Sequence, residues 1–262
     1  MSASSESQSA VNPPAVPEIN EVDLSDLRAS LALGWQDFRR APTPGVIFAA
    51  VYVLGGWLIW WATTTQGQIW WTLPASAGFP ILGPFIACGF YEISRRLEAG
   101  KALDMGGVFG VIWQQKDRQI PSMAAVIVVF FLFWNFLAHM IFALFLGNAP
   151  MTNVSSSLAV FATVEGMSML VVGTVVGAVF ATLLFSLTVV SLPMLLDREV
   201  DFVTAMLTSF ALVRENPVVM LGWGGLIGIA LFLGMLPGFL GLFLVLPLFG
   251  HATWHLYRRA IT

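Results

Sequence analysis

The chain has 262 residues, of which 57% are hydrophobic and only 10% are charged. Soluble domains are usually about 45–50% apolar and about 25% charged, so this chain has too few charges to cover its apolar surface in water. The net charge of -3 gives no basic field for nucleic acid. The lone cysteine, Cys88, excludes an internal disulfide and a thiolate metal cage. We therefore expect an all-α, polytopic membrane protein whose main partner is the lipid bilayer.

The beginning of the chain differs from the rest. Residues 1–22 contain Ser, Pro and Glu but no Lys or Arg. They lack the basic start and the apolar stretch of a cleaved signal peptide. We predict that residues 1–22 form a disordered cytoplasmic tail and that residues 23–262 form the transmembrane domain.

Six stretches are long and apolar enough to cross the bilayer, because about 20 apolar residues span its hydrocarbon core. They are predicted near residues 44–64, 69–93, 121–146, 167–192, 218–235 and 238–257. Residues 158–164 precede the fourth stretch and are predicted to be a re-entrant or interfacial lead-in. The pair Pro237-Gly238 separates the last two, because Pro removes a backbone donor and Gly tolerates a turn.

The placement of basic residues tests these six spans independently. All 12 Lys and Arg residues lie before the first span, between the second and third, between the fourth and fifth, or after the sixth. The opposite loops, near residues 65–68, 147–157 and 236–237, contain none. Because cytoplasmic loops collect Lys and Arg, both termini are predicted to be cytoplasmic.

The chain also reads as three repeats of an amphipathic helix followed by a transmembrane hairpin. Each amphipathic helix follows an aspartate, and each set of apolar residues falls on one helical face. The sets are Leu24, Leu27, Leu31, Trp35 and Phe38 after Asp23; Met105, Phe109, Ile112 and Trp113 after Asp104; and Phe202, Met206, Phe210 and Val213 after Asp201. Pro42, Pro121 and Pro217 then open a span, as proline does at a first helical turn. We predict three interfacial helices on the cytoplasmic face.

The closing spans of the first and third repeats resemble each other in sequence. The segment PFIACGFYEISRR from Pro84 aligns without gaps with PLFGHATWHLYRR from Pro247. The middle repeat keeps only a truncated form, PMLLDRE from Pro193. Matched prolines and Arg pairs favour an internal repeat over chance likeness between apolar helices.

Small residues recur every four positions in two predicted spans. They are Gly173, Gly177 and Ala181 in the fourth span and Gly224 and Gly228 in the fifth. In lipid such stripes let helix backbones approach closely. We interpret them as internal helix packing, with a homo-oligomer or partner interface as the alternative.

Tryptophans gather at the predicted first outer turn. They are Trp57, Trp60, Trp61, Trp70 and Trp71. Their position is typical of the aromatic belt that forms at a membrane interface. A quinone or lipid slot between the aromatic rings is the alternative.

Three histidines are the candidate cofactor ligands. His139 lies in the third span with Asn135 one turn away, and His251 and His255 are spaced i, i+4 on the sixth. Such spacing presents two imidazoles to one side, as a metal or haem site needs. However, His139 is predicted roughly 10 Å away in depth from the other two. We therefore interpret all three as hydrogen-bonded histidines, and expect no cofactor and no metal site.

Charged residues near the spans supply the remaining polar candidates. Glu92 precedes Arg95 and Arg96 by three and four residues, which predicts a local ion pair at a helix end. Proton handling is the alternative for this group. Glu165 is the only charged residue assigned to the outer half, where it would contact an external cation or lie in a hydrated loop. No enzyme signature occurs in the chain.

Two segments, residues 33–61 and 79–103, resemble a family of predicted bacterial integral membrane proteins of unknown function. The shared motifs are Trp35–Asp37, Gly83–Pro84 and Tyr91–Arg96. The resemblance implies a bacterial inner membrane protein and brings no catalytic residues with it. Some members of the family are labelled cytochrome c oxidase subunit I. This chain has three histidines and half as many predicted spans as that catalytic subunit, so it cannot be one.

Three classes of function stay open on sequence alone. The first is a non-catalytic accessory or interaction protein, bound to itself or to another membrane complex such as a respiratory one. The second is a small-molecule or ion transporter, which the repeats favour but the nearly charge-free bilayer centre does not. The third is a redox protein that binds haem or quinone.

Overall fold

The computed structural model describes residues 17–65, 83–104, 119–147 and 158–262, together with residues 106, 108 and 110. These residues are almost entirely helical. The helices are α1 (Leu24–Arg40), α2 (Pro42–Thr65), α4 (Gly83–Glu98), α6 (Ile120–Leu146), the 3₁₀ helix η4 (Leu158–Ala162), α8 (Val164–Thr188), α9 (Ser191–Asp197), α10 (Phe202–Glu215), α11 (Pro217–Met235) and α12 (Leu242–Ala260).

Four described helical segments are long and apolar enough to cross a membrane. They are Pro42–Trp61, Ile120–Leu146, Val164–Asp197 and Pro217–Met235. They coincide with the first, third, fourth and fifth predicted spans, so the chain is a helical, multi-pass membrane protein. Much of the second predicted span falls on residues 66–82, which lie outside the described residues. The sixth corresponds to α12, which the same length and hydropathy criterion does not select.

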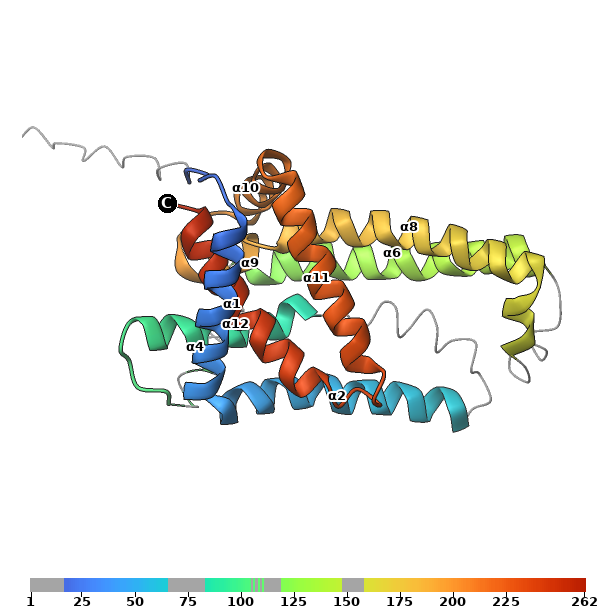
Figure 1. The fold of residues 1–262 in the computed structure, drawn as a ribbon, viewed down its shortest axis with the longest axis horizontal. Helices are drawn as coiled ribbons and strands as arrows, with labels where there is room; N and C mark the ends of the chain where they lie inside the picture. The colour runs from blue at the N-terminus through green and yellow to red at the C-terminus, as the bar shows by residue number, and fades with distance from the viewer. Residues whose placement is uncertain are drawn as a thin grey trace, which may run out of the picture.

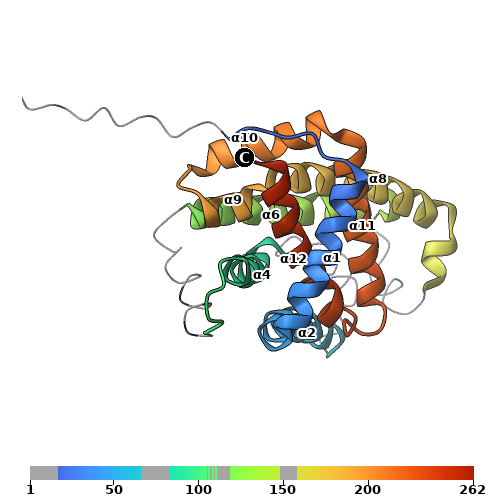
Figure 2. The same ribbon diagram turned by 60° about the vertical axis from the view of Figure 1, so that its left-hand side comes forward.

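The helices lie in two main directions (Figures 1 and 2). In Figure 1, α6 and α8 form a long hairpin along the long axis, and α2 runs in the same direction along the opposite edge. Helices α11 and α12 cross the space between them. Helix α1 lies transverse to α2 at the end of the bundle where α2 begins.

Two of the aspartates that precede the predicted amphipathic helices are N-caps. The Asp23 carboxylate accepts hydrogen bonds from the backbone N–H groups of Ser25 and Asp26 in a capping box. Asp201 accepts from the N–H of Thr204 at the start of α10. The predicted amphipathic helix after Asp104 falls largely on residues outside the described ranges.

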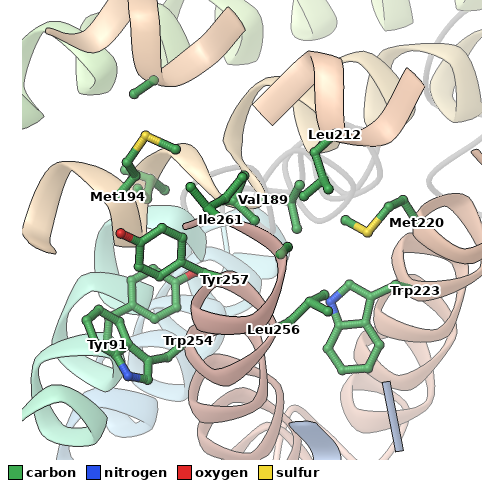
Figure 3. Close-up of a cluster of buried hydrophobic side chains, with 14 of the residues drawn as sticks. Tyr91, Val189, Met194, Leu212, Met220, Trp223, Trp254, Leu256, Tyr257 and Ile261 are labelled. Atoms are coloured by element: carbon green, nitrogen blue, oxygen red, sulfur yellow. The ribbon is translucent and has the colours of Figure 1, made fainter. Parts of the chain in front are cut away.

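Helix α12 is the centre of the described bundle, because it packs against α1, α2, α4 and α11. Trp254, Leu256 and Tyr257 on α12 are fully buried, and so is Trp223 on α11. Figure 3 shows Tyr257 near Met194, and Trp223 near Met220 and Leu256, among the other apolar residues of the core. A helix enclosed in this way needs no uniformly apolar surface, which explains why its mean hydropathy is lower than that of a helix in contact with lipid.

Helix α1 packs through a face that the sequence pattern does not identify. The apolar set predicted for this helix is only partly covered: Leu27 is buried, but Leu24 is 62% exposed and Trp35 is 43% exposed. The buried face is Leu27, Ser30, Gly34 and Asp37. A Cβ atom at Gly34 would lie 2.6 Å from the backbone nitrogen of Ala252, so glycine is required where α1 meets α12.

The predicted tail boundary at residue 22 is wrong for residues 17–22. Ile19 pairs with Ile261 in an antiparallel bridge, and the Glu18 N–H donates to the Thr262 carbonyl at 3.1 Å. The buried Val22 N–H donates to the Asn216 side chain at 2.9 Å. Long-range backbone pairing of this kind leaves no signal in composition, and it attaches this segment to the end of α12.

Candidate functional site

A polar network fastens the charged ends of α4, α9 and α12 together. The Arg258 guanidinium lies 3.2 Å from the Glu98 carboxylate and 3.2 Å from the Asp197 carboxylate. The Tyr257 hydroxyl donates to Asp197 at 2.9 Å, and Arg198 donates to the Tyr257 oxygen at 3.1 Å. Each of these groups therefore has a structural partner, and the network serves to join helices.

Glu92 forms the local ion pairs that its spacing predicts. Its carboxylate lies 2.7 Å from Arg95 and 2.7 Å from Arg96, and the Glu92 side chain is 1% exposed. Both arginines hold this buried charge within α4, as the (i, i+3) and (i, i+4) geometry requires. The alternative of proton handling stays a prediction.

His251 and His255 share one face of α12 but bind different helices. His251 Nδ1 shares a 2.8 Å hydrogen bond with the Ser94 hydroxyl of α4. His255 Nε2 lies 2.7 Å from the Asp37 carboxylate of α1. The two imidazoles therefore connect α12 to two neighbours, in agreement with the interpretation as hydrogen-bonded residues. Asp37 belongs to the Trp35–Asp37 motif, but the sequence does not assign it this partner, and it does not identify Ser94, because a buried polar partner on a distant helix has no local pattern.

His139 and Asn135 make local contacts on α6. The Asn135 amide donates to the Phe131 carbonyl at 2.9 Å, and His139 Nδ1 lies 2.6 Å from the Asn135 carbonyl. Within the described ranges, no group of three or more His, Cys, Asp or Glu residues is placed to hold a metal ion. Glu165 is exposed in the first turn of α8, where a negative charge is favourable at a helix N-terminus.

An apolar cavity of about 650 Å³ lies between the helices. Its walls come from α4, α6, α8, α9, α11 and α12, with Phe161 of η4. Every residue of the two predicted small-residue stripes lines it: Gly173, Gly177, Ala181, Gly224 and Gly228. The fourth and fifth predicted spans therefore turn these stripes toward one shared space.

The glycines of the stripes differ in what they face. A Cβ atom at Gly177 would meet the Trp134 ring at 2.9 Å, and one at Gly224 would meet the Phe185 ring at 3.2 Å. Gly173 and Gly228 have no neighbouring atom within 4 Å of an added Cβ. The stripes thus make room for aromatic rings and for the cavity, whereas the sequence-based interpretation expects two helix backbones in close contact.

The cavity wall is mostly apolar. Its aromatic residues are Phe90, Tyr91, Trp134, Phe142, Phe161, Phe180, Phe185 and Phe249, and its polar side chains include His139, Thr174 and Thr253. At about 1.5 Å per residue, Gly173 lies about 14 Å from the start of α8 and Gly228 about 17 Å from the start of α11. This depth places the cavity within the apolar part of both spans.

Residues 72–197 match the sequence model of a family described as "Predicted integral membrane protein (DUF2189)". The match supports the resemblance to predicted membrane proteins of unknown function. The description names no oxidase, so the oxidase label gains no support. No curated protein and no solved structure matches the chain.

Proposed function

We propose that this protein is a non-catalytic binding protein of the membrane interior, whose glycine-lined cavity holds the apolar chain of a lipid-class molecule. The observation that carries this proposal is the cavity of about 650 Å³ at which both glycine stripes converge. Ligand pockets are commonly about 300–1,000 Å³ and mainly apolar, with a few polar groups that fix orientation. Acyl and isoprenoid chains match this lining.

The chemistry of the lining favours an apolar chain over an ion or a polar solute. A transported ion needs polar or charged ligands at bilayer depth. The nearest candidates, Asn135 and His139, bind backbone carbonyls of their own helix. Open space above Gly173 and Gly228, by contrast, admits a chain without moving a side chain.

Retained lipid in the purified protein tests this proposal. Native mass spectrometry in mild detergent should show a lipid-class molecule bound to the protein, and the double variant G173L/G228L should lose most of it by filling the cavity. The matched control is Gly225→Leu on α11, since Gly225 also has open space around its Cβ position but does not line the cavity. Equal lipid retention by the cavity variant and the wild type would reject the proposal.

We propose that a protein with such a lipid-binding cavity acts as an accessory protein. The protein would associate with itself or with another membrane complex, a respiratory one being the suggestion of the resemblance. Gentle purification from native membranes, with identification of the co-purifying proteins, tests this role. A visible absorption spectrum of the same sample tests the haem alternative, and a colourless protein without partners would favour transport instead.

We also propose a topology of six crossings in a bacterial inner membrane, with both termini cytoplasmic and three repeated units. The one-sided placement of all 12 Lys and Arg residues supports it. The deep burial of α12 supplies a reason for its modest hydropathy. Reporter fusions at Gly67 and Asn148 should report the outside and one at Lys101 the cytoplasm. A cytoplasmic signal at Asn148 would overturn this topology.

A further inference from the structure

Helix α1 has an apolar stripe that the described bundle covers only in part. Its packing face points to α12 through Ser30, Gly34 and Asp37. About a quarter turn away lies a second row, made of Leu24, Leu31, Trp35 and Phe38. In that row Leu24 is 62% exposed and Trp35 is 43% exposed. A helix that is anchored on one side and apolar on an adjacent side needs a second apolar environment.

The position of α1 identifies that environment as the membrane surface. One residue, Ala41, separates the end of α1 from the start of α2, and α2 contains a candidate membrane span. Figure 1 shows α1 transverse to α2 at this end of the bundle. A helix that runs across the beginning of a span lies near the plane of the interface, where an apolar stripe sinks between headgroups.

Two of the three arginines of α1 stand beside the stripe. At about 100° per residue, Arg28 and Arg39 lie roughly 40–60° from Leu24 around the helix axis. Both are exposed. None of the ion pairs or side-chain hydrogen bonds found over residues 17–65, 83–104, 119–147 and 158–262 involves either guanidinium.

The acidic residues of α1 do not neutralise these arginines. Asp37 lies 2.7 Å from His255, and Asp26 lies 3.2 Å from Arg259. The remaining aspartate beside the helix, Asp23, caps its N-terminus. Within the described residues, the two guanidinium groups at the edge of the apolar stripe are therefore left without a carboxylate partner.

We infer that α1 is a docking surface for anionic phospholipids in the leaflet at which α2 begins. The apolar stripe enters the acyl boundary while Arg28 and Arg39 contact lipid phosphates, for which the planar guanidinium fork is well shaped. Helix α10 provides an internal comparison. It also exposes apolar residues, Val203, Leu207 and Phe210, but its arginine, Arg214, lies 3.8 Å from Glu215. We assign the anionic preference to α1 alone.

Lipid competition in nanodiscs tests this preference. The full-length protein is placed in mixed phosphatidylcholine and phosphatidylglycerol bilayers, and the lipids that it retains are counted by native mass spectrometry. The wild type should enrich phosphatidylglycerol, and R28Q/R39Q should reduce that enrichment by about fivefold for each arginine removed. The matched control Arg214→Gln should keep it. Unchanged enrichment in R28Q/R39Q, or an equal loss in Arg214→Gln, would overturn the inference.

A second measurement keeps both arginines and reports how deep α1 lies in the bilayer, so it tests the inference even if R28Q/R39Q does not fold. Spin labels are attached through Leu24→Cys or Gln36→Cys, each with the buried Cys88 replaced by Ala. Leu24 lies on the stripe, and Gln36 lies about 120° away on the exposed face. We expect the spin label at residue 24 to collide mainly with dissolved oxygen. The spin label at residue 36 should collide mainly with a water-soluble nickel complex. The same accessibility at both positions, or a label at 24 that prefers the nickel complex, would contradict membrane docking.

Discussion

The α6–α8 hairpin and the α1–α12 contact are both pairs of associated helices, but different kinds of contact hold them together. Along the hairpin, only 11% of the most apolar window of each helix is buried, and the contacts are aromatic, such as Phe133 stacked on Phe180. Between α1 and α12 the contacts are a glycine against an alanine backbone and a carboxylate against an imidazole. One region relies on lipid as its solvent, and the other excludes lipid.

This difference shows why hydropathy identifies some membrane helices more easily than others. A helix surrounded by lipid must be apolar on most of its surface. A helix surrounded by protein needs only matched partners, and α12 carries His251, Thr253 and His255. The comparison leads to four predictions, ordered by the size of the effect.

Replacement of Asp37 by Ala should have the largest effect, because it leaves the half-buried His255 without the carboxylate that it meets. Loss of one partner from a buried pair commonly costs about 3–5 kcal/mol. We expect a decrease of that order in the free energy of unfolding, measured by SDS titration in mixed micelles. The control is Arg259→Gln, which removes an exposed pair with Asp26 and should cost about 0–1 kcal/mol. If both variants lower the free energy of unfolding equally, the Asp37–His255 pair contributes no more to stability than the exposed Asp26–Arg259 pair.

Gly177→Leu should destabilise the hairpin by about 1–3 kcal/mol, the usual cost of overpacking. The Trp134 ring, 2.9 Å from an added Cβ, would have to move. Gly173→Leu is the matched control, since it lies one turn earlier on α8 in open space. Thermal unfolding in detergent checks both variants. If Gly177→Leu is as stable as Gly173→Leu, the close contact with Trp134 is not present.

Trp57→Phe should have a smaller effect, at the junction between α2 and the turn after α11. The Trp57 indole donates to the Gly238 carbonyl at 2.8 Å. A typical intramolecular hydrogen bond contributes about 0.5–1.5 kcal/mol, and Phe keeps most of the apolar contact. Trp60→Phe serves as the control for a general loss of interfacial tryptophan. The same SDS titration should show a larger decrease in the free energy of unfolding for Trp57→Phe than for Trp60→Phe.

The smallest effect concerns pH and the N-cap of α10. Hydrogen bonds from the Thr204 side chain and backbone hold the pKa of Asp201 below its ordinary value of 3.8. A lowered carboxyl pKa stabilises the folded state above the ordinary value and loses that contribution as the pH falls below it. Stability should therefore decline between about pH 5 and pH 3, and Asp201→Asn, which caps without titrating, should show a shallower decline. Identical pH profiles would contradict a role for this carboxylate.

The sequence predicts the lipid-facing parts of the fold well. Runs of apolar residues and opening prolines locate α2, α6, α8 and α11 within a few residues. The caps at Asp23 and Asp201 are local patterns, so they are also predictable. Helix α12 is predicted as a helix, but its central place in the bundle is not, because burial by protein depends on partners distant in the chain.

The candidate site is likewise predictable from the sequence only where local patterns define it. The glycine stripes are visible in the sequence, since they repeat every four residues. Their orientation toward a cavity is not, because Trp134 and Phe185 fill part of the space from other turns and other helices. The Asp37–His255 pair joins residues 218 positions apart, a separation that no local pattern reveals.

That separation has a consequence for biosynthesis. Helix α1 leaves the ribosome long before α12, yet α12 supplies the backbone against which Gly34 packs and the imidazole that meets Asp37. During translation α1 therefore has only α2 and α4 to pack against while the intervening helices enter the membrane. The main packing of α1 therefore forms late, only after α12 has been made.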